Sequence, residues 1–121
     1  MSARPADSLE QLRLKLADFA HRRDWEQFHS PKNLAMALIA EAAELVEHFQ
    51  WLSEEQSRRL EPAALAEVRL ELADILIYLI RTADRLGIDL IAAAEDKIRI
   101  NEQRYPVEKA RGSARRAADY E

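Results

Sequence analysis

The sequence contains no cysteine, and this absence excludes disulfide-stapled folds, thiol catalysis and metal sites built from cysteine. Only two glycines occur among its 121 residues, Gly87 and Gly112, so it contains no glycine-rich phosphate-binding loop. A chain with so few turn-forming glycines is also a poor candidate for a β-sandwich or a β-barrel.

Basic charge and long apolar segments are also scarce. The 18 Lys and Arg residues are outnumbered by 22 acids, which gives a formal net charge of −4, whereas general nucleic-acid binders normally carry a basic excess. The longest mostly apolar run, residues 34–46, contains two glutamates and is too short to span a bilayer. The first 20 residues mix acids and bases and show no continuous apolar targeting core. We therefore expect a cytoplasmic protein with neither nucleic acid nor membrane as a partner.

Apolar residues recur at three- and four-residue spacing along most of the chain, which predicts an all-α fold. Capping residues, prolines and Gly87 divide this pattern into segments. The first predicted helix follows a cap at Asp7 or Ser8 and ends near Arg23, and the second runs from Ser30-Pro31 to about Trp51. A short helix over 54–60 and a long helix over 62–86 follow. The last helix begins after an Asp89 cap and ends at about Arg104. These helices and their connections give one domain over residues 1–105, and residues 106–121 are predicted to be a mobile or partner-covered tail.

Two of the predicted helical segments, residues 34–46 and 72–80, are apolar on nearly every side. A helix at the surface of a protein would show a polar face, so both segments are expected to be buried. Four helices of a small bundle cannot easily surround two of their own members. We therefore expect a four-helix-bundle-like fold that assembles into a homo-oligomer, either a dimer or a tetramer.

Four acids interrupt these apolar segments, and each pair has i,i+3 spacing: Glu41 with Glu44, and Glu71 with Asp74. Two antiparallel helices packed at about 8–10 Å could bring both pairs together. Burying unpaired carboxylates costs several kcal/mol each, so the groups either protonate or surround a cation. A site made of carboxylate oxygens suits Mg²⁺ or Mn²⁺ better than Zn²⁺. A di-iron site is disfavoured because the sequence has no Glu-x-x-His.

Side chains able to recognise a nucleotide accompany these acids, and a magnesium site of this kind is typically completed by substrate phosphates. Each of them alone is commonly a core or surface residue, but together with the acids they describe a pocket for an aromatic base and a polyphosphate. The candidate substrate-binding residues are Trp25, His29, Asn33, Trp51, Tyr78, Lys97, Asn101 and Arg104.

The chain resembles the MazG-like group of all-α nucleoside triphosphate pyrophosphohydrolases, and within it the dCTP pyrophosphatases. The mark of the family is Glu-x-x-Glu, a spacer and Glu-x-x-Asp, which here are Glu41–Glu44, 26 residues, and Glu71–Asp74. The matching flanks are RDWEQFHSPKNL (23–34), EHFQWLS (47–53), ELADILIYLI (71–80) and NEQRYPVEKARGSA (101–114).

This resemblance implies Mg²⁺-dependent hydrolysis of dCTP or a modified dCTP to the monophosphate and pyrophosphate, in a dimer or tetramer. The four acids would hold the metal, and one of them or a nearby water would supply the nucleophile. Trp25 and Trp51 would hold the base with help from Tyr78 and Asn101, and Lys97 and Arg104 would meet the phosphates. The chain departs from some close members at Leu16, where they carry a substrate-facing histidine.

Two other functions fit the same residues. One is a non-catalytic helical module that binds nucleotides or a partner protein. The other is a structural oligomer whose buried acids are protonated or pair with Arg69 and Arg81. The complete set of four acids favours the enzyme, because a degenerate relative would be expected to lack at least one of them.

Overall fold

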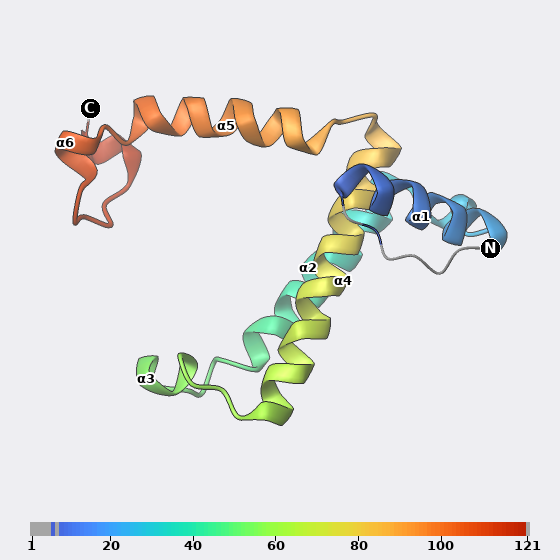
Figure 1. The fold of residues 1–121 in the computed structure, drawn as a ribbon, viewed down its shortest axis with the longest axis horizontal. Coiled ribbons are helices and arrows are strands. Elements are labelled where there is room, and N and C mark those ends of the chain that lie inside the picture. Colours follow the sequence, from blue (N-terminus) through green and yellow to red (C-terminus); the bar gives the residue numbers. More distant parts are fainter. Residues whose placement is uncertain (1–5, 7, 121) are drawn as a thin grey trace. The chain divides into compact units, whose positions relative to one another are not determined.

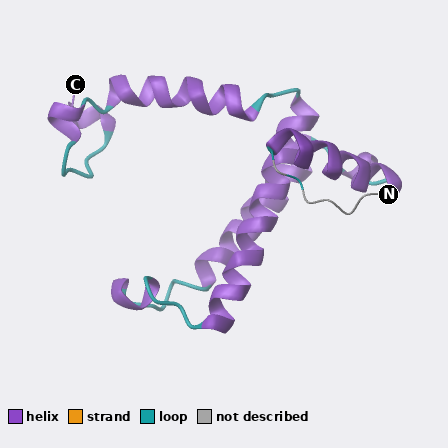
Figure 2. Cartoon of the chain, in the orientation of Figure 1, coloured by secondary structure: helices purple, strands orange, loops and turns teal. Residues whose placement is uncertain are grey.

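The computed structural model describes residue 6 and residues 8–120, so Asp7, one of the two predicted N-caps, lies outside the described residues. Every regular element in this part of the chain is helical, which confirms the all-α prediction (Figures 1 and 2). The elements are α1 (Leu9–Arg22), η1 (Glu26–Phe28), α2 (Pro31–Glu47), α3 (Glu54–Ser57), α4 (Pro62–Leu86), α5 (Leu90–Arg104), α6 (Val107–Ala110) and η2 (Ala117–Tyr120). None of the described helices is both long enough and apolar enough to cross a membrane.

The chain divides into two compact units, one ending at Gly87 and one beginning at Ile88. In the first unit α2 and α4 lie side by side along their lengths, and α1 packs against α4 (Figure 1). Leu34 of α2 together with Val68 and Ile80 of α4 supplies the buried apolar side chains of this helix pair. Both apolar segments singled out in the sequence therefore belong to neighbouring helices.

Helix ends in this unit follow the predicted signals. Ser8 and Ser30 accept hydrogen bonds from backbone N–H groups in the first turns of α1 and α2, and Ser53 forms a capping box with Gln56. Gly87 ends α4 in the left-handed conformation, with φ of 69°. Two ends come earlier than predicted, because α2 gives way to turns after Glu47 and α3 after Ser57.

The end of α1 fixes where the following segment begins. The backbone N–H of Trp25 donates to the carbonyl of Ala20 at 2.9 Å, and that of Asp24 donates to His21 at 3.0 Å. This is a Schellman-type closure, which requires a left-handed residue, and Asp24 takes that role with φ of 54°. The closure turns the chain back toward α1 immediately before the aromatic residue Trp25.

In the second unit, η2 packs against α5. The Tyr120 ring is buried, meets Tyr105 edge-on at 6.0 Å, and its hydroxyl donates to Ser113 Oγ at 3.1 Å. Lys109 Nζ also donates to the carbonyl of Tyr120, at 3.1 Å. The last segment therefore makes contacts within its own unit, and the mobile or partner-covered tail stays a prediction. The predicted domain boundary at residue 105 stays a prediction.

Leu34 is the most completely buried large side chain of the α2–α4 pair, with 2% of its surface exposed. Replacing it by alanine removes apolar contacts and leaves a cavity, so Leu34→Ala should lower the free energy of unfolding by about 2–5 kcal/mol. Urea denaturation at fixed protein concentration measures this change. Lys32→Ala, an exposed change in the same helix, should stay within about 0.5 kcal/mol of the parent chain. Equal losses in the two variants would contradict this assignment of the core.

Candidate active site

Three of the four predicted acids meet where α2 packs against α4. Glu41 and Glu44 come from α2 and Glu71 comes from α4, and one carboxylate oxygen of each lies within 4.8 Å of the others. The i,i+3 spacing on α2 directs both of its glutamates to the same face, which is the face that meets α4. Helix packing thus converts two separate sequence motifs into one cluster of oxygens.

The environment of this cluster disfavours negative charge. Burial, followed by the charges of Glu44 and Asp74, raises the pKa of Glu41 to about 7. Burial and the neighbouring Glu44 also raise the pKa of Glu71. Oε2 of Glu41 and Oε2 of Glu71 are buried without a hydrogen-bond partner among the described residues.

These features fit a divalent cation. A cation between the carboxylates would offset their mutual repulsion and engage the two unpartnered oxygens. The donor set consists of hard carboxylate oxygens, which suit Mg²⁺ or Mn²⁺. Glu41, Glu44 and Glu71 are therefore the residues that could hold such an ion.

Asp74, the fourth predicted ligand, stands outside this three-residue group. It lies one turn beyond Glu71 on α4, and its charge acts on Glu41. Its side chain also lines a neighbouring cavity of about 270 Å³. Asp74 therefore lies between the carboxylate cluster and the cavity.

The cavity is mainly apolar and aromatic. The residues of this kind that line it are Leu16, Phe19, Ala20, Trp25, Ile77 and Tyr78. Trp25 meets Phe19 edge-on at 5.7 Å and His29 at 6.1 Å, so the rings form a connected aromatic wall. Three of the predicted substrate-binding residues, Trp25, His29 and Tyr78, are thus brought together, and Leu16 also belongs to the wall.

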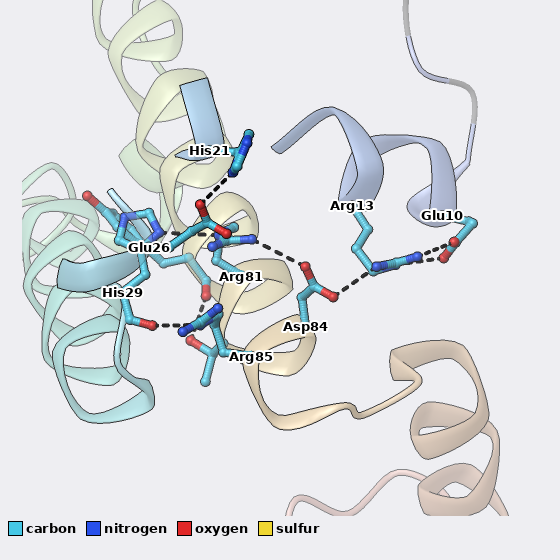
Figure 3. A network of polar contacts seen from close by, with 10 residues as sticks. Glu10, Arg13, His21, Glu26, His29, Arg81, Asp84 and Arg85 are labelled. Carbon is cyan, nitrogen blue, oxygen red and sulfur yellow. Dashed lines mark hydrogen bonds and ion pairs between the residues drawn. The ribbon is translucent and has the colours of Figure 1, made fainter. Parts of the chain in front are cut away.

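A polar network supports one side of the cavity (Figure 3). The buried guanidinium of Arg81 donates from Nη1 to Asp84 at 3.2 Å and from Nε to Nδ1 of His29 at 3.3 Å. Asp84 also accepts a 2.9 Å hydrogen bond from Arg13 of α1, and Arg85 donates to the backbone carbonyl of His29 at 3.1 Å. Burial and the charges of Arg81 and Arg85 lower the pKa of His29, so its imidazole is neutral at pH 7.

The other predicted substrate-binding residues do not line this cavity. Trp51 is 87% exposed in the turn before α3, and the Asn33 side chain donates to the carbonyl of Phe28 at 3.0 Å. Lys97, Asn101 and Arg104 share a face of α5, which belongs to the second unit. Their roles in substrate binding stay predictions.

Sequence reasoning missed two polar residues of the site. Arg81 was considered only as a partner of the four acids, whereas it pairs with Asp84. Its place three residues after Tyr78 on one helix face was the available signal. Nε2 of His48 lies 4.0 Å from Oε1 of Glu71, and its Nδ1 lies 3.7 Å from Oε2 of Glu67, across the α2–α4 contact. Only the packing of the two helices reveals that contact.

Comparisons with known proteins agree with this geometry. The MazG-like family profile matches residues 37–119, which include all four acids. The chain is 45% identical over 117 residues to dCTP pyrophosphatase 1 of Rattus norvegicus, covering 95% of this chain and 69% of the rat protein. It is 44% identical over 114 residues to dCTP pyrophosphatase 1 of Homo sapiens, covering 93% and 67%. A crystal structure of a pyrophosphatase from Archaeoglobus fulgidus matches with a TM-score of 0.78 and 36% identity, over 88% of this chain and 99% of that one. The chain therefore belongs to the MazG-like family.

Proposed function

We propose that this protein hydrolyses a deoxynucleoside triphosphate, dCTP or a modified dCTP, to the monophosphate and pyrophosphate with the help of Mg²⁺. The observation that carries the proposal is the cluster of Glu41, Glu44 and Glu71, two of whose oxygens are buried, next to an aromatic cavity. Relatives named dCTP pyrophosphatase 1 support the choice of substrate. Mn²⁺ could take the place of Mg²⁺, because the ligands are carboxylate oxygens.

In the proposed reaction, a water oxygen forms a bond to the α-phosphorus. The bond from that phosphorus to the oxygen bridging the α- and β-phosphates breaks, and pyrophosphate leaves with the bridging oxygen. Bound Mg²⁺ would neutralise charge on the phosphates and make water a better nucleophile. Glu41, Glu44, Glu71 and Asp74 would hold the ion, and a carboxylate oxygen not engaged by it can accept the proton of the attacking water.

The cavity is proposed as the site of the base. Trp25, His29 and Tyr78 line it, and Asp74 lies on its wall next to the carboxylate cluster. A base held there would place the phosphates near the acids. Trp51 and Asn33 are proposed as further contacts to the base side of the nucleotide. Lys97 and Arg104 are proposed to meet the phosphates, and Asn101 is proposed to support the base.

Exposed apolar side chains on α2 and α4 support assembly into a homo-oligomer, a dimer or a tetramer. Six such side chains, each at least 39% exposed, are Met36, Ile39, Leu70, Leu72, Leu76 and Leu79. A monomer that presented so many apolar side chains on neighbouring helices would be prone to associate. We also propose a cytoplasmic location, where nucleotide substrates occur, with no nucleic-acid partner.

The direct test of the activity is the release of pyrophosphate from a panel of canonical and modified NTPs and dNTPs, with Mg²⁺ and with EDTA. The proposal predicts Mg²⁺-dependent release from dCTP and its 5-substituted forms, with little release from purine nucleotides. Release from a different or broad set of nucleotides would support the proposed reaction and contradict dCTP as the preferred substrate. Absence of release from every nucleotide would favour the non-catalytic binding module.

The carboxylate cluster should control that activity. Glu41→Gln and Glu71→Gln each remove a negatively charged ligand, so each should lower kcat/KM by more than about 100-fold. Glu47→Gln is the matched control because Glu47 is exposed on the same helix as Glu41, and it should stay within about twofold of the parent enzyme. Steady-state pyrophosphate release measures all three. Full turnover by either cluster variant would contradict its assignment as a ligand.

The raised pKa of Glu41 makes metal binding dependent on pH. An unperturbed glutamate loses its proton near pH 4.5, whereas Glu41 keeps its proton to about pH 7 in the folded chain. The folded state thus binds more protons than the unfolded state between these values, and the stability of the metal-free protein should fall as the pH rises through this window.

Because Mg²⁺ binding must displace the proton of Glu41, the ion should raise the melting temperature more at pH 8 than at pH 6. Thermal scans with EDTA and with Mg²⁺ at both pH values measure this difference. Glu41→Gln should lose most of it. An equal increase at the two pH values in the parent protein would show that Glu41 carries no proton that the metal displaces.

A further inference from the structure

The Arg81 guanidinium has a hydrogen-bond donor that the protein itself leaves unused. The residue is 4% exposed, and its Nε and Nη1 donate to His29 and Asp84. Its third nitrogen, Nη2, is buried and has no acceptor within hydrogen-bond distance among the described residues. A buried donor without a partner is costly, and more so when it belongs to a charged group, so this position in the fold calls for an acceptor.

Arg81 also lines the cavity, together with Trp25, Tyr78 and Asp74. Nη2 therefore belongs to a side chain of the cavity wall, where neighbouring atoms cover it. The rest of the guanidinium is fixed, because Asp84 is held in turn by Arg13 (Figure 3). A donor held in this way is pre-organised for a ligand, which costs less conformational entropy than ordering a flexible side chain.

The charges around the cavity favour a neutral ring over a phosphate. Asp84 already compensates the charge of Arg81, and without a metal ion the Asp74 carboxylate on the same wall would repel an anion. Trp25 and Tyr78 offer ring surfaces for stacking a planar group. The volume of about 270 Å³ lies just below the roughly 300–1,000 Å³ of pockets for drug-sized molecules, so it suits a base and not a whole triphosphate.

Arg81 also determines which hydrogen-bonding face His29 offers. Its Nε–H donates to Nδ1 of His29, so that nitrogen acts as an acceptor and the proton of the neutral imidazole lies on Nε2. His29 lines the same cavity. Arg81 therefore also sets the hydrogen-bonding character of His29 on this wall.

From these contacts we propose that Arg81 is a specificity-determining residue, whose Nη2 donates a hydrogen bond to an acceptor atom of the nucleobase bound in the cavity. For cytosine, the acceptor is O2 or N3 of the ring. The inference rests on the proposed function in taking the ligand to be a nucleotide. It does not depend on turnover, and it can be tested without metal.

The test is calorimetric binding of dCMP in EDTA to the full chain and to two variants. Arg81→Met removes the donor, and its affinity for dCMP should fall about 10–100-fold, the usual effect of losing a hydrogen bond to a charged group. Arg59→Met is the matched control because Arg59 has the same charge, is exposed in the same unit and does not line the cavity. It should bind dCMP within about twofold of the parent chain.

A second ligand separates the base from the phosphates. Binding of inorganic tripolyphosphate with Mg²⁺ should be the same, within about twofold, in Arg81→Met and in the parent chain. An equal loss for tripolyphosphate and dCMP would make Arg81 a phosphate ligand and overturn the proposal. Unchanged dCMP affinity in Arg81→Met would also overturn it. So would failure of the parent chain to bind any of the four nucleotides dCMP, dTMP, dAMP and dGMP.

A measurement on the unmodified chain covers the case in which Arg81→Met does not fold. The side-chain N–H signals of Arg81, assigned through its own carbon chain by NMR, should shift when dCMP is added and stay in place when tripolyphosphate is added. Absence of a shift at saturating dCMP would overturn the proposal. If the shift occurs but the chain releases no pyrophosphate from any nucleotide, the role of Arg81 in binding the base is supported and the proposed function is contradicted.

Discussion

The gathering of carboxylates at one helix interface, with two of their oxygens shielded from water, is the constraint on which the site depends. Glu41 and Glu71 each have a buried oxygen without a partner among the described residues, and their pKa values are raised first by burial and then by the neighbouring acids. Packing of α2 against α4 imposes this arrangement, since the same contact buries Leu34 and Ile80. The stability of the apolar core therefore offsets the free-energy cost of bringing these carboxylates together. A divalent cation bound between them would lower that cost.

The second organising feature is the chain of charges from α1 to the cavity. Arg13 and Arg81 share Asp84, and Arg81 reaches His29, so three segments of the first unit meet in one network (Figure 3). Such a network fixes side chains that would otherwise rotate freely. The carboxylate cluster and the cavity thus have separate supports, one from helix packing and one from ion pairs, with Asp74 next to both.

Much of this could be predicted because local signals determined the helices. Serine caps, two proline starts and Gly87 placed the elements, and the resemblance to the MazG-like family is confirmed. The i,i+3 spacing predicted that both pairs of acids could meet, and the structure brings together three of the four, Glu41, Glu44 and Glu71. What could not be predicted depends on contacts between distant segments. The bond from Arg81 to His29 spans 52 residues, and no spacing rule within a helix applies to it. The packing of Tyr120 in the last segment likewise follows from a buried ring that composition alone does not reveal.

The position of the metal is tested most directly by anomalous diffraction from crystals grown with Mn²⁺ and α,β-methylene dCTP. This analogue cannot be cleaved between the α- and β-phosphates, because a methylene group replaces the bridging oxygen. We expect an anomalous peak in contact with carboxylate oxygens of Glu41, Glu44 and Glu71, with the phosphates beside it and the base in the aromatic cavity. Mn²⁺ bound away from these three glutamates, with their carboxyl groups hydrogen-bonded to one another, would contradict it.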